Sequence, residues 1–260
     1  MKICRYKYNA EIYFGAIEND SIFPIENAEL IEEITDSNDT GEPVRLTEVE
    51  LLFPFEPSKI VCVGRNYSAH AKELGNEVPA EPLLFLKAPS SLILANHAIT
   101  IPRQSKQVEH EGELGAVIGR KCKNLTDDDN PFEYIFGYIC LNDVTARDLQ
   151  RKDVQFTRAK SFDTFCPISS YVETNLDVSD IRVATKVNGI VKQEGRTSEM
   201  VFSVPFLIRY ISNQMTLNAG DIIATGTPSG VSVLKDGDVC EVEIEGIGVL
   251  RNPVKNMEKI

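Results

Sequence analysis

The 260-residue chain is 42% hydrophobic and 25% charged, which is typical of a globular protein with a large core. Its net charge of −12, with no lysine- and arginine-rich run, argues against a nucleic acid or an anionic membrane surface as partner. No apolar stretch approaches the roughly 18 residues of a membrane-spanning helix, and the first residues do not read as a signal peptide. We therefore expect a cytoplasmic protein with neither a membrane nor a nucleic-acid partner.

The cysteines support the same compartment. No two of them form a Cys-Xaa-Xaa-Cys pair, and most of them lie inside apolar runs. The six are Cys4, Cys62, Cys122, Cys140, Cys166 and Cys240. This distribution indicates reduced core residues and not a disulfide framework or a zinc site.

Residues 1–56 predict a small β-rich domain, followed by a larger domain over residues 57–260. Two β-prone runs, 11–17 and 21–25, predict strands, and a polar loop follows at 36–41. The proline-containing segment 54–57 predicts an extended linker, because proline removes a donor and biases its predecessor away from helix. Nothing before this linker indicates catalytic chemistry.

The larger domain opens with a predicted buried strand at 59–64 and a short helix at 69–74, with Ser68 as a plausible N-cap. His70 and Glu73 are three residues apart, so they share a helix face. This pair indicates a proton-transfer dyad, in which the carboxylate orients the imidazole and the imidazole activates a water. The alternative is a solvated helix with an incidental histidine.

The segment from Glu109 to Gly119 organises the rest of the chain. Its apolar half predicts a buried strand, and on a strand Glu111 and Glu113 point to the same face. Two carboxylates that lie side by side repel each other unless a proton or a cation lies between them. A hard divalent cation fits such an all-oxygen site. Glu109 is either a third acid or the solvated mouth of the strand. The alternative for the whole motif is the exposed face of an edge strand.

A further acid follows the next apolar run. Residues 136–141 predict a strand that ends at Asp143, and Thr145 with Asp148 matches a capping-box pattern at the start of a helix. Asp143 is therefore either a third metal ligand or a turn residue. Between the two strands, Thr126 and the aspartates after it predict the start of another helix.

Cations and a loop complete the candidate site. The predicted strand 82–87 ends in Lys87, which either lines a site or only ends the strand. Residues 151–160 predict a surface loop that delivers Lys160, a cation able to hold a substrate oxyanion beside a metal. After a predicted strand at 221–225, the 226–230 loop can offer backbone N–H groups and the Thr227 hydroxyl to a carboxylate, or be a plain turn.

Several of these pieces, in this order, resemble one family, the fumarylacetoacetate hydrolase family. The matching pieces are Val63-Gly64-Arg65-Asn66-Tyr67 with His70 and Glu73, His110-Glu111-Gly112-Glu113-Leu114, the 142–150 segment, Ala159-Lys160-Ser161-Phe162-Asp163, Val187-Asn188-Gly189 and Ala224-Thr225-Gly226-Thr227-Pro228. The resemblance extends from about residue 57 to the C-terminus.

The resemblance implies a fold and a site. The implied fold is α+β and mainly β, a mixed β-roll that is usually dimeric, with a small N-terminal domain. The implied metal ligands for Mg²⁺ or Mn²⁺, with Ca²⁺ as a substitute, are Glu111, Glu113 and Asp143. The implied catalytic residues are His70, Glu73 and Lys160, and the implied substrate-binding residues are Arg65, Tyr67, Gln150 and Thr227.

The sequence therefore predicts a metal-dependent enzyme that hydrolyses or decarboxylates a small 2-oxo acid, of the acylpyruvate or oxaloacetate type, through a metal-bound enolate. Two alternatives remain open: an isomerase of the 2-hydroxyhepta-2,4-diene-1,7-dioate type, and a non-catalytic metal- or ligand-binding protein. The presence of both His70 and Glu73 favours an enzyme that uses water, because a binding protein needs no such dyad.

Overall fold

The computed structural model describes residues 1–25, 28, 31–34 and 41–258. Strands dominate it, which confirms the predicted mainly β fold with short helices. Most of the polar loop predicted at 36–41 lies outside the described residues. No helix in the described part of the chain has the length and apolar character that a membrane crossing requires.

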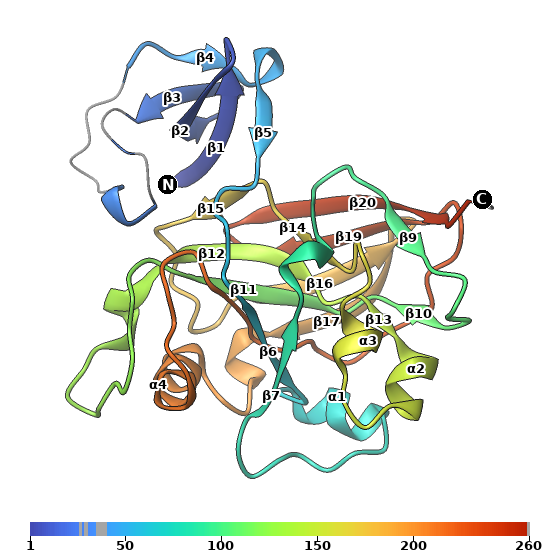
Figure 1. The fold of residues 1–260 in the computed structure, drawn as a ribbon. Coiled ribbons are helices and arrows are strands. Elements are labelled where there is room, and N and C mark those ends of the chain that lie inside the picture. The colour runs from blue at the N-terminus through green and yellow to red at the C-terminus, as the bar shows by residue number, and fades with distance from the viewer. Residues whose placement is uncertain (26–27, 29–30, 35–40, 259–260) are drawn as a thin grey trace.

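The N-terminal part is an antiparallel sheet with the order β4-β3-β2-β1, and β5 pairs with the other edge of β1 (Figure 1). Its strands are β1 (Lys2–Tyr8), β2 (Glu11–Glu18), β3 (Ser21–Ile25), β4 (Val44–Arg45) and β5 (Glu50–Leu52). Beyond β5, the same edge of β1 pairs with β15 (Tyr171–Glu173), so the sheet continues from the N-terminal part into the rest of the chain.

The central part of this sheet has the order β15-β12-β11-β18-β6-β7. Its strands are β12 (Ile135–Asn142), β11 (Gly112–Ile118), β18 (Ile222–Ala224), β6 (Ile60–Gly64) and β7 (Leu83–Lys87). Two short strands, β14 (Cys166–Ile168) and β8 (Leu92–Leu94), extend it beside β12. All seven residues of β11 are buried, as its apolar sequence predicts.

A second sheet with the order β17-β16-β19-β20-β9 packs against β11. Its strands are β17 (Ile190–Arg196), β16 (Arg182–Val187), β19 (Val239–Ile244), β20 (Gly248–Asn256) and β9 (Ile99–Ile101). Leu114 and Ala116 of β11 share a core with Val183, Val242 and Ile244 of this sheet. A separate pair of strands, β10 (Val108–Glu109) and β13 (Thr145–Ala146), lies next to the start of β11. The central sheet therefore has an apolar core behind it and a polar end at residues 109–113.

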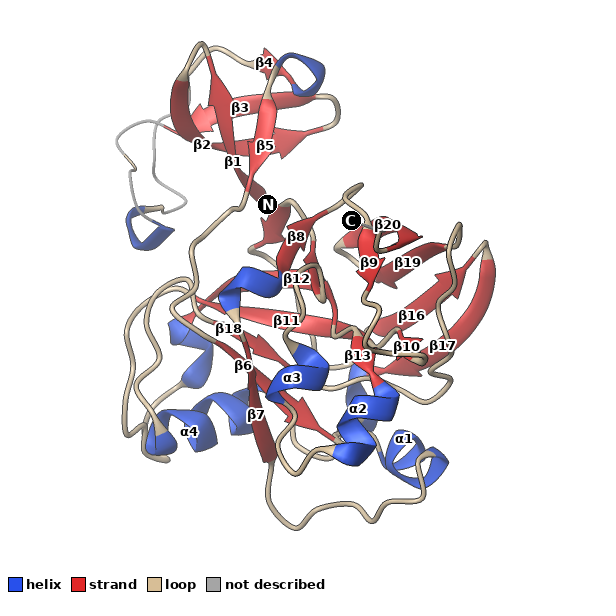
Figure 2. Cartoon of the chain, turned by 45° about the vertical axis from the view of Figure 1, so that its right-hand side comes forward, coloured by secondary structure: helices blue, strands red, loops and turns tan. Residues whose placement is uncertain are grey.

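Three short helices gather at that polar end, whereas the longer α4 packs elsewhere (Figure 2). The helices are α1 (Ser68–Glu73), α2 (Arg147–Lys152), α3 (Thr157–Lys160) and α4 (Val204–Gln214). α4 buries Leu207, Ile208 and Ile211 in the core that β11 shares. Helices as short as α1, α2 and α3 are not stable alone in water, so packing at the end of the sheet determines their conformation.

The structure corrects the prediction of a helix that starts at Thr126. The Asp129 carboxylate accepts hydrogen bonds from the backbone N–H and the hydroxyl of Thr126, both at 2.8 Å, which closes a turn. A 3₁₀ turn follows only at Pro131–Tyr134. Aspartate thus bonds back to the local backbone here, an alternative to helix that its short side chain makes available.

Two helix starts and one loop were also predicted wrongly. Tyr67, and not Ser68, holds the N-cap position of α1, with no side-chain capping bond. Thr145 lies in β13, and the Asp148 carboxylate accepts hydrogen bonds from residues 105 and 106, so no capping box forms. The predicted surface loop at 151–160 contains the end of α2 and the whole of α3, and Lys160 at its end is buried.

The six cysteines are free and buried, as predicted. Burial raises the pKa of the Cys140, Cys166 and Cys240 thiols to about 12. Only the thiolate is nucleophilic, so the folded protein should not react with a thiol reagent such as Ellman's reagent at pH 8. We expect no absorbance change before denaturation and six thiols per chain after it. Rapid labelling of the folded protein would contradict this expectation.

Candidate active site and metal centre

A cavity of about 340 Å³ is lined by residues of α1, α2 and α3 and of the central sheet. Figure 2 shows these three short helices near one end of that sheet. Every predicted site residue except Tyr67 lines this cavity: Arg65, His70, Glu73, Glu111, Glu113, Asp143, Gln150, Lys160 and Thr227. The fold thus brings together residues that are up to 162 positions apart in the sequence, from Arg65 to Thr227.

The carboxylates of Glu111, Glu113 and Asp143 converge in this cavity. One oxygen of each lies within 4.8 Å of one oxygen of the other two, and all three side chains are buried. Glu111 lies just before β11 and not on it, but its backbone N–H donates to the Asn142 side chain at 2.9 Å, and its C=O accepts from the Asp143 N–H at 2.8 Å. These bonds fix Glu111 beside the end of β12, which delivers Asp143.

The electrostatics of the triad favour a bound cation. Burial and the carboxylates of Asp143 and Glu111 raise the pKa of Glu113 well above its usual range. Burial also opposes ionisation of Glu111, but Lys160 and Arg147 outweigh it and lower the pKa of that carboxyl group. The set contains only carboxylate oxygens, the donors that Mg²⁺, Mn²⁺ and Ca²⁺ prefer. These residues therefore fit a hard divalent cation.

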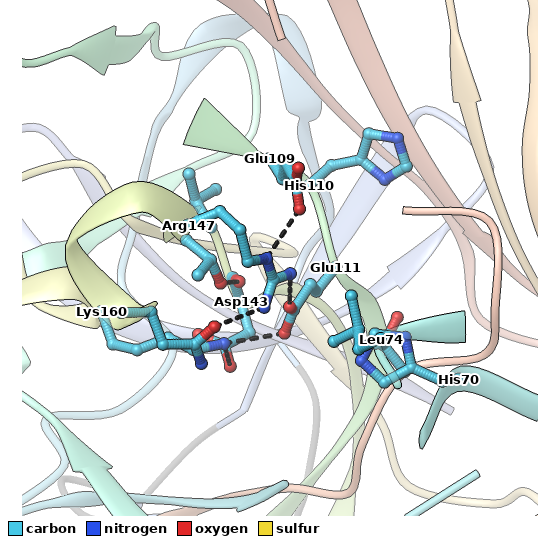
Figure 3. Close-up of polar contacts among 12 residues, drawn as sticks. His70, Leu74, Glu109, His110, Glu111, Asp143, Arg147 and Lys160 are labelled. Carbon is cyan, nitrogen blue, oxygen red and sulfur yellow. Dashed lines mark hydrogen bonds and ion pairs between the residues drawn. The ribbon is translucent and has the colours of Figure 1, made fainter. Parts of the chain in front are cut away.

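Three cationic side chains contact acids of the triad, and Figure 3 labels two of them, Lys160 and Arg147. The Lys160 ammonium donates to Glu111 Oε2 at 2.7 Å and to Asp143 Oδ2 at 2.6 Å. The fully buried Lys87 ammonium donates to Asp143 Oδ1 at 2.7 Å, and Arg147 pairs with Glu111. Glu111 and Asp143 are thus each held in one orientation by cations, whereas Glu113 Oε2 accepts from the Gly226 backbone N–H at 2.8 Å. These contacts matter because buried charges require partners.

Glu109 is neither a member of the triad nor a solvent-exposed residue at the start of the strand. It is buried, and its Oε2 accepts from Arg147 Nε at 2.7 Å, while Gln107 Nε2 donates to its other oxygen at 2.6 Å. The chain leaves β10 at Glu109 and enters β11 only at Gly112, so the regular alternation expected from 109 to 113 is broken. Glu109 therefore orients Arg147, which in turn orients Glu111.

His70 of the predicted dyad lies on the opposite side of Glu111 from Lys160 in the view of Figure 3. His70 is buried on α1, and its Nδ1 lies 3.4 Å from Glu73 Oε2. The Glu73 carboxylate also accepts from the backbone N–H of Gly230, at 3.0 Å and 3.1 Å to its two oxygens. The loop at 226–230 thereby fixes the carboxylate, and the carboxylate orients the imidazole.

The predicted substrate-binding residues differ in how they are held. Arg65 takes a left-handed backbone conformation with φ of 60°, directly after β6. Gln150 Oε1 accepts from Arg147 Nη1 at 2.5 Å. The Thr227 hydroxyl donates to the Gly112 carbonyl at 2.8 Å, so its proton is committed to the protein. Tyr67 is buried, and its hydroxyl has no hydrogen-bond partner among the described residues.

From the sequence, Lys87 has two interpretations and Arg147 has no predicted role. Both are charged residues next to apolar or β-prone segments, which is a weak signal for a buried ion pair. Their partners are 56 residues away for Lys87, which bonds to Asp143, and 36 residues away for Arg147, which bonds to Glu111. Only the folded structure shows that these charges are paired.

Comparisons with known proteins add a family and named relatives. The family model described as fumarylacetoacetate (FAA) hydrolase C-terminal matches residues 59–255, and the Rv2993c-like N-terminal model matches residues 1–54. The mitochondrial oxaloacetate decarboxylase of Dictyostelium discoideum is 46% identical, over 73% of this chain and 89% of that protein. The oxaloacetate tautomerase YisK of Bacillus subtilis is 40% identical, over 80% of this chain and 74% of that protein.

A solved structure extends the similarity to the whole chain. The crystal structure of 2-hydroxyhepta-2,4-diene-1,7-dioate isomerase from Mycobacterium marinum is 39% identical, with a TM-score of 0.88. The match covers all of this chain and all of that one. The N-terminal sheet is therefore shared with this structure, and not only the part that carries the cavity.

Proposed function

The chain belongs to the fumarylacetoacetate hydrolase family, and we propose that it cleaves a carbon–carbon bond of a small 2-oxo acid with the help of a divalent metal. The observation that supports this most is the position of the His70–Glu73 pair in the same cavity as the buried Glu111, Glu113 and Asp143. The proposed reactions are hydrolysis of an acylpyruvate and decarboxylation of oxaloacetate, both of which release pyruvate.

Glu111, Glu113 and Asp143 would hold Mg²⁺ or Mn²⁺, with Ca²⁺ as a substitute. When bound, this cation polarises the 2-oxo group and compensates the negative charge that develops on the departing pyruvate unit. Lys160 supplies a second positive charge beside the same carboxylates, where it can hold a substrate oxygen.

The protein groups supply the proton transfers. With Nδ1 of His70 directed to Glu73, its Nε2 is left to accept a proton from a water molecule that attacks the 4-oxo carbon of an acylpyruvate. The same nitrogen then returns the proton to the pyruvate unit as the bond breaks. Glu73 fixes the orientation of the imidazole, because its carboxylate lies beside Nδ1 of His70.

A second candidate reaction moves a proton between carbons without cleavage. The names of the Bacillus subtilis tautomerase and the Mycobacterium marinum isomerase favour it. The His70–Glu73 pair can serve this reaction as well, because a base that deprotonates water can also move a proton between carbon atoms.

One set of assays separates these reactions. The protein, with added Mg²⁺ or Mn²⁺, is incubated with acylpyruvates, oxaloacetate and 2-hydroxyhepta-2,4-diene-1,7-dioate. Pyruvate is measured by coupling to lactate dehydrogenase, and the enol forms are followed by their ultraviolet absorbance. Pyruvate release from an acylpyruvate or from oxaloacetate supports cleavage, whereas enol loss without pyruvate release supports the second candidate. A cavity that binds metal but converts none of these compounds would favour a binding protein.

The proposal includes a homodimer, which is an expectation from the family and not from the surface of the chain. Light scattering coupled to size exclusion should give twice the chain mass of 29.0 kDa at micromolar concentration. A mass equal to that of one chain under these conditions would refute the dimer. The measurement is independent of activity and of bound metal.

A further inference from the structure

Gln193 is a buried amide on a strand that is otherwise mostly exposed. It lies on β17, where only Gln193 and Gly195 are buried, and its residue exposure is 0%. A fully buried amide must satisfy two donors and two acceptor positions within the protein, or it destabilises the fold.

All four hydrogen-bonding positions of this amide are used. Gln193 Oε1 accepts from the Gly112 N–H at 3.0 Å and from His110 Nδ1 at 2.9 Å. Its Nε2 donates to the Thr227 hydroxyl oxygen and to the Pro228 carbonyl, both at 2.7 Å. Because the Gly112 N–H can only donate and the Pro228 carbonyl can only accept, the side-chain amide of Gln193 has one possible orientation.

The same bonds fix the neighbouring protons. Since Gln193 Oε1 is an acceptor, His110 Nδ1 carries a hydrogen, and His110 Nε2 can accept from the Ser232 hydroxyl at 2.8 Å. Thr227 accepts from Gln193 and gives its own hydroxyl proton to the Gly112 carbonyl at 2.8 Å. Both backbone polar groups of Gly112 are therefore held by this network.

Gly112 is the residue between Glu111 and Glu113, so its position determines the direction of both carboxylates. The opposite side of this glycine is closed sterically, because an added Cβ would lie 2.0 Å from the Thr185 hydroxyl oxygen. Gly112 is thus confined by Thr185 of β16 and held by two hydrogen bonds, one from its N–H to Gln193 and one to its carbonyl from Thr227.

The loop after β18 is held in the same way. Gln193 contacts two consecutive residues of that loop, Thr227 and Pro228, and the Gly226 N–H donates to Glu113 Oε2 at 2.8 Å. Thr227 itself lines the cavity. A shift of this loop would therefore move both a residue of the cavity lining and a partner of Glu113.

We propose that Gln193 is a positioning residue that holds the Glu111–Glu113 segment and the 226–230 loop in one fixed relative arrangement. It has no place in the cavity lining and acts only through Gly112, Thr227 and Pro228. The proposal rests on the proposed function for its kinetic readout alone, because its effect on metal affinity can be measured without any substrate.

The test compares Gln193→Met with the parent protein and with a control, Asn252→Leu. Methionine has a similar shape but makes none of the four hydrogen bonds. Asn252 is also a buried amide, whose side chain donates to the carbonyls of Leu94 and His97, away from the cavity. Both variants should lose thermal stability, so stability by itself does not distinguish a positioning role from a structural one.

The affinity of metal-stripped protein for Mg²⁺ and Mn²⁺ distinguishes a positioning role of Gln193 from a purely structural one. Loss of a residue that orients metal ligands typically weakens binding about 10- to 100-fold, and we expect this for Gln193→Met. Asn252→Leu should bind metal within about twofold of the parent, as remote independent sites do. Equal metal affinity in parent and folded Gln193→Met overturns the proposal. If Gln193→Met does not fold, Gln193→Glu replaces it, because its carboxylate keeps the acceptor positions and loses both donors.

A double-mutant cycle with Thr227→Val tests the loop side of the proposal. If Gln193 acts through Thr227, the KM increase of the double variant should be clearly smaller than the product of the two single increases. Independent, multiplicative increases overturn the coupling. If the parent converts none of the assayed 2-oxo acids, the proposed function fails, while the metal affinities still decide the role of Gln193.

Discussion

Replacing Glu113 by glutamine is expected to abolish measurable Mg²⁺ and Mn²⁺ binding, with a dissociation constant at least about 100-fold above that of the parent, because affinity at oxygen sites depends on ligand charge. Glutamine keeps the shape of the side chain, and its amide oxygen can still accept from the Gly226 N–H. What it removes is one of three carboxylates that converge within 4.8 Å. Titration calorimetry on metal-stripped protein measures the effect directly.

Thermal unfolding provides a second measurement of the same change. In the parent, metal at about 100 times its dissociation constant should stabilise the fold by about 2.7 kcal/mol, an increment that the chelator EDTA removes. Glu113→Gln should show no such increment. With EDTA present, it should unfold at or above the temperature of the parent, because it removes a buried carboxylate whose charge burial and two neighbouring acids oppose.

A matched control is Glu173→Gln, which changes a buried glutamate on β15, outside the cavity. It should lose some stability, because Glu173 accepts from the Asn175 N–H at 3.1 Å, but it should bind metal as the parent does. If Glu113→Gln bound metal with the affinity of the parent, the triad would not be the metal site.

The part of the site that sequence predicted depends on short-range patterns. The apolar run of β11 and the strand end at Asp143 are both visible in the chain, and the structure places them next to each other as β11 pairs with β12. The sequence predicted that Glu111 and Glu113 point to the same face because side chains alternate along one strand. That reason was wrong, because Glu111 precedes β11 and only Glu113 lies on it. The residue types were informative, whereas the local geometry came from hydrogen bonds to Asn142 and Asp143.

The part that sequence did not predict depends on long-range pairing. Lys87 bonds to Asp143, and Gln193 bonds to Gly112, His110, the Thr227 hydroxyl and the Pro228 carbonyl. All these partners are more than 30 residues away. A lysine at a strand end and a glutamine on a polar strand are ordinary surface patterns. The helix predicted after Asp143 is present as α2, but it starts at Arg147 and not at the capping-box pattern. α3 was missed for a related reason, since a helix of four residues forms through packing and has little periodicity to detect.

Replacing His70 by alanine is expected to lower acylpyruvate cleavage by roughly two to four orders of magnitude while metal affinity stays that of the parent. The imidazole is the group placed to take a proton from water, because it is buried in the cavity lining and oriented by Glu73. Glu73→Gln should lower cleavage by a similar factor, since the Glu73 carboxylate orients the imidazole. Steady-state kinetics with saturating Mg²⁺ and calorimetry on the same preparations measure both quantities.

The double variant and a control make this prediction specific. His70 and Glu73 act as one unit, so the losses should not multiply, and the double variant should resemble His70→Ala. His97→Ala removes an exposed histidine that does not line the cavity, and it should cleave at the parent rate. Decarboxylation of oxaloacetate needs no attacking water, so His70→Ala should reduce it less than it reduces acylpyruvate cleavage. Parent-like acylpyruvate cleavage in both single variants would show that the His70–Glu73 pair is not the base of the hydrolysis.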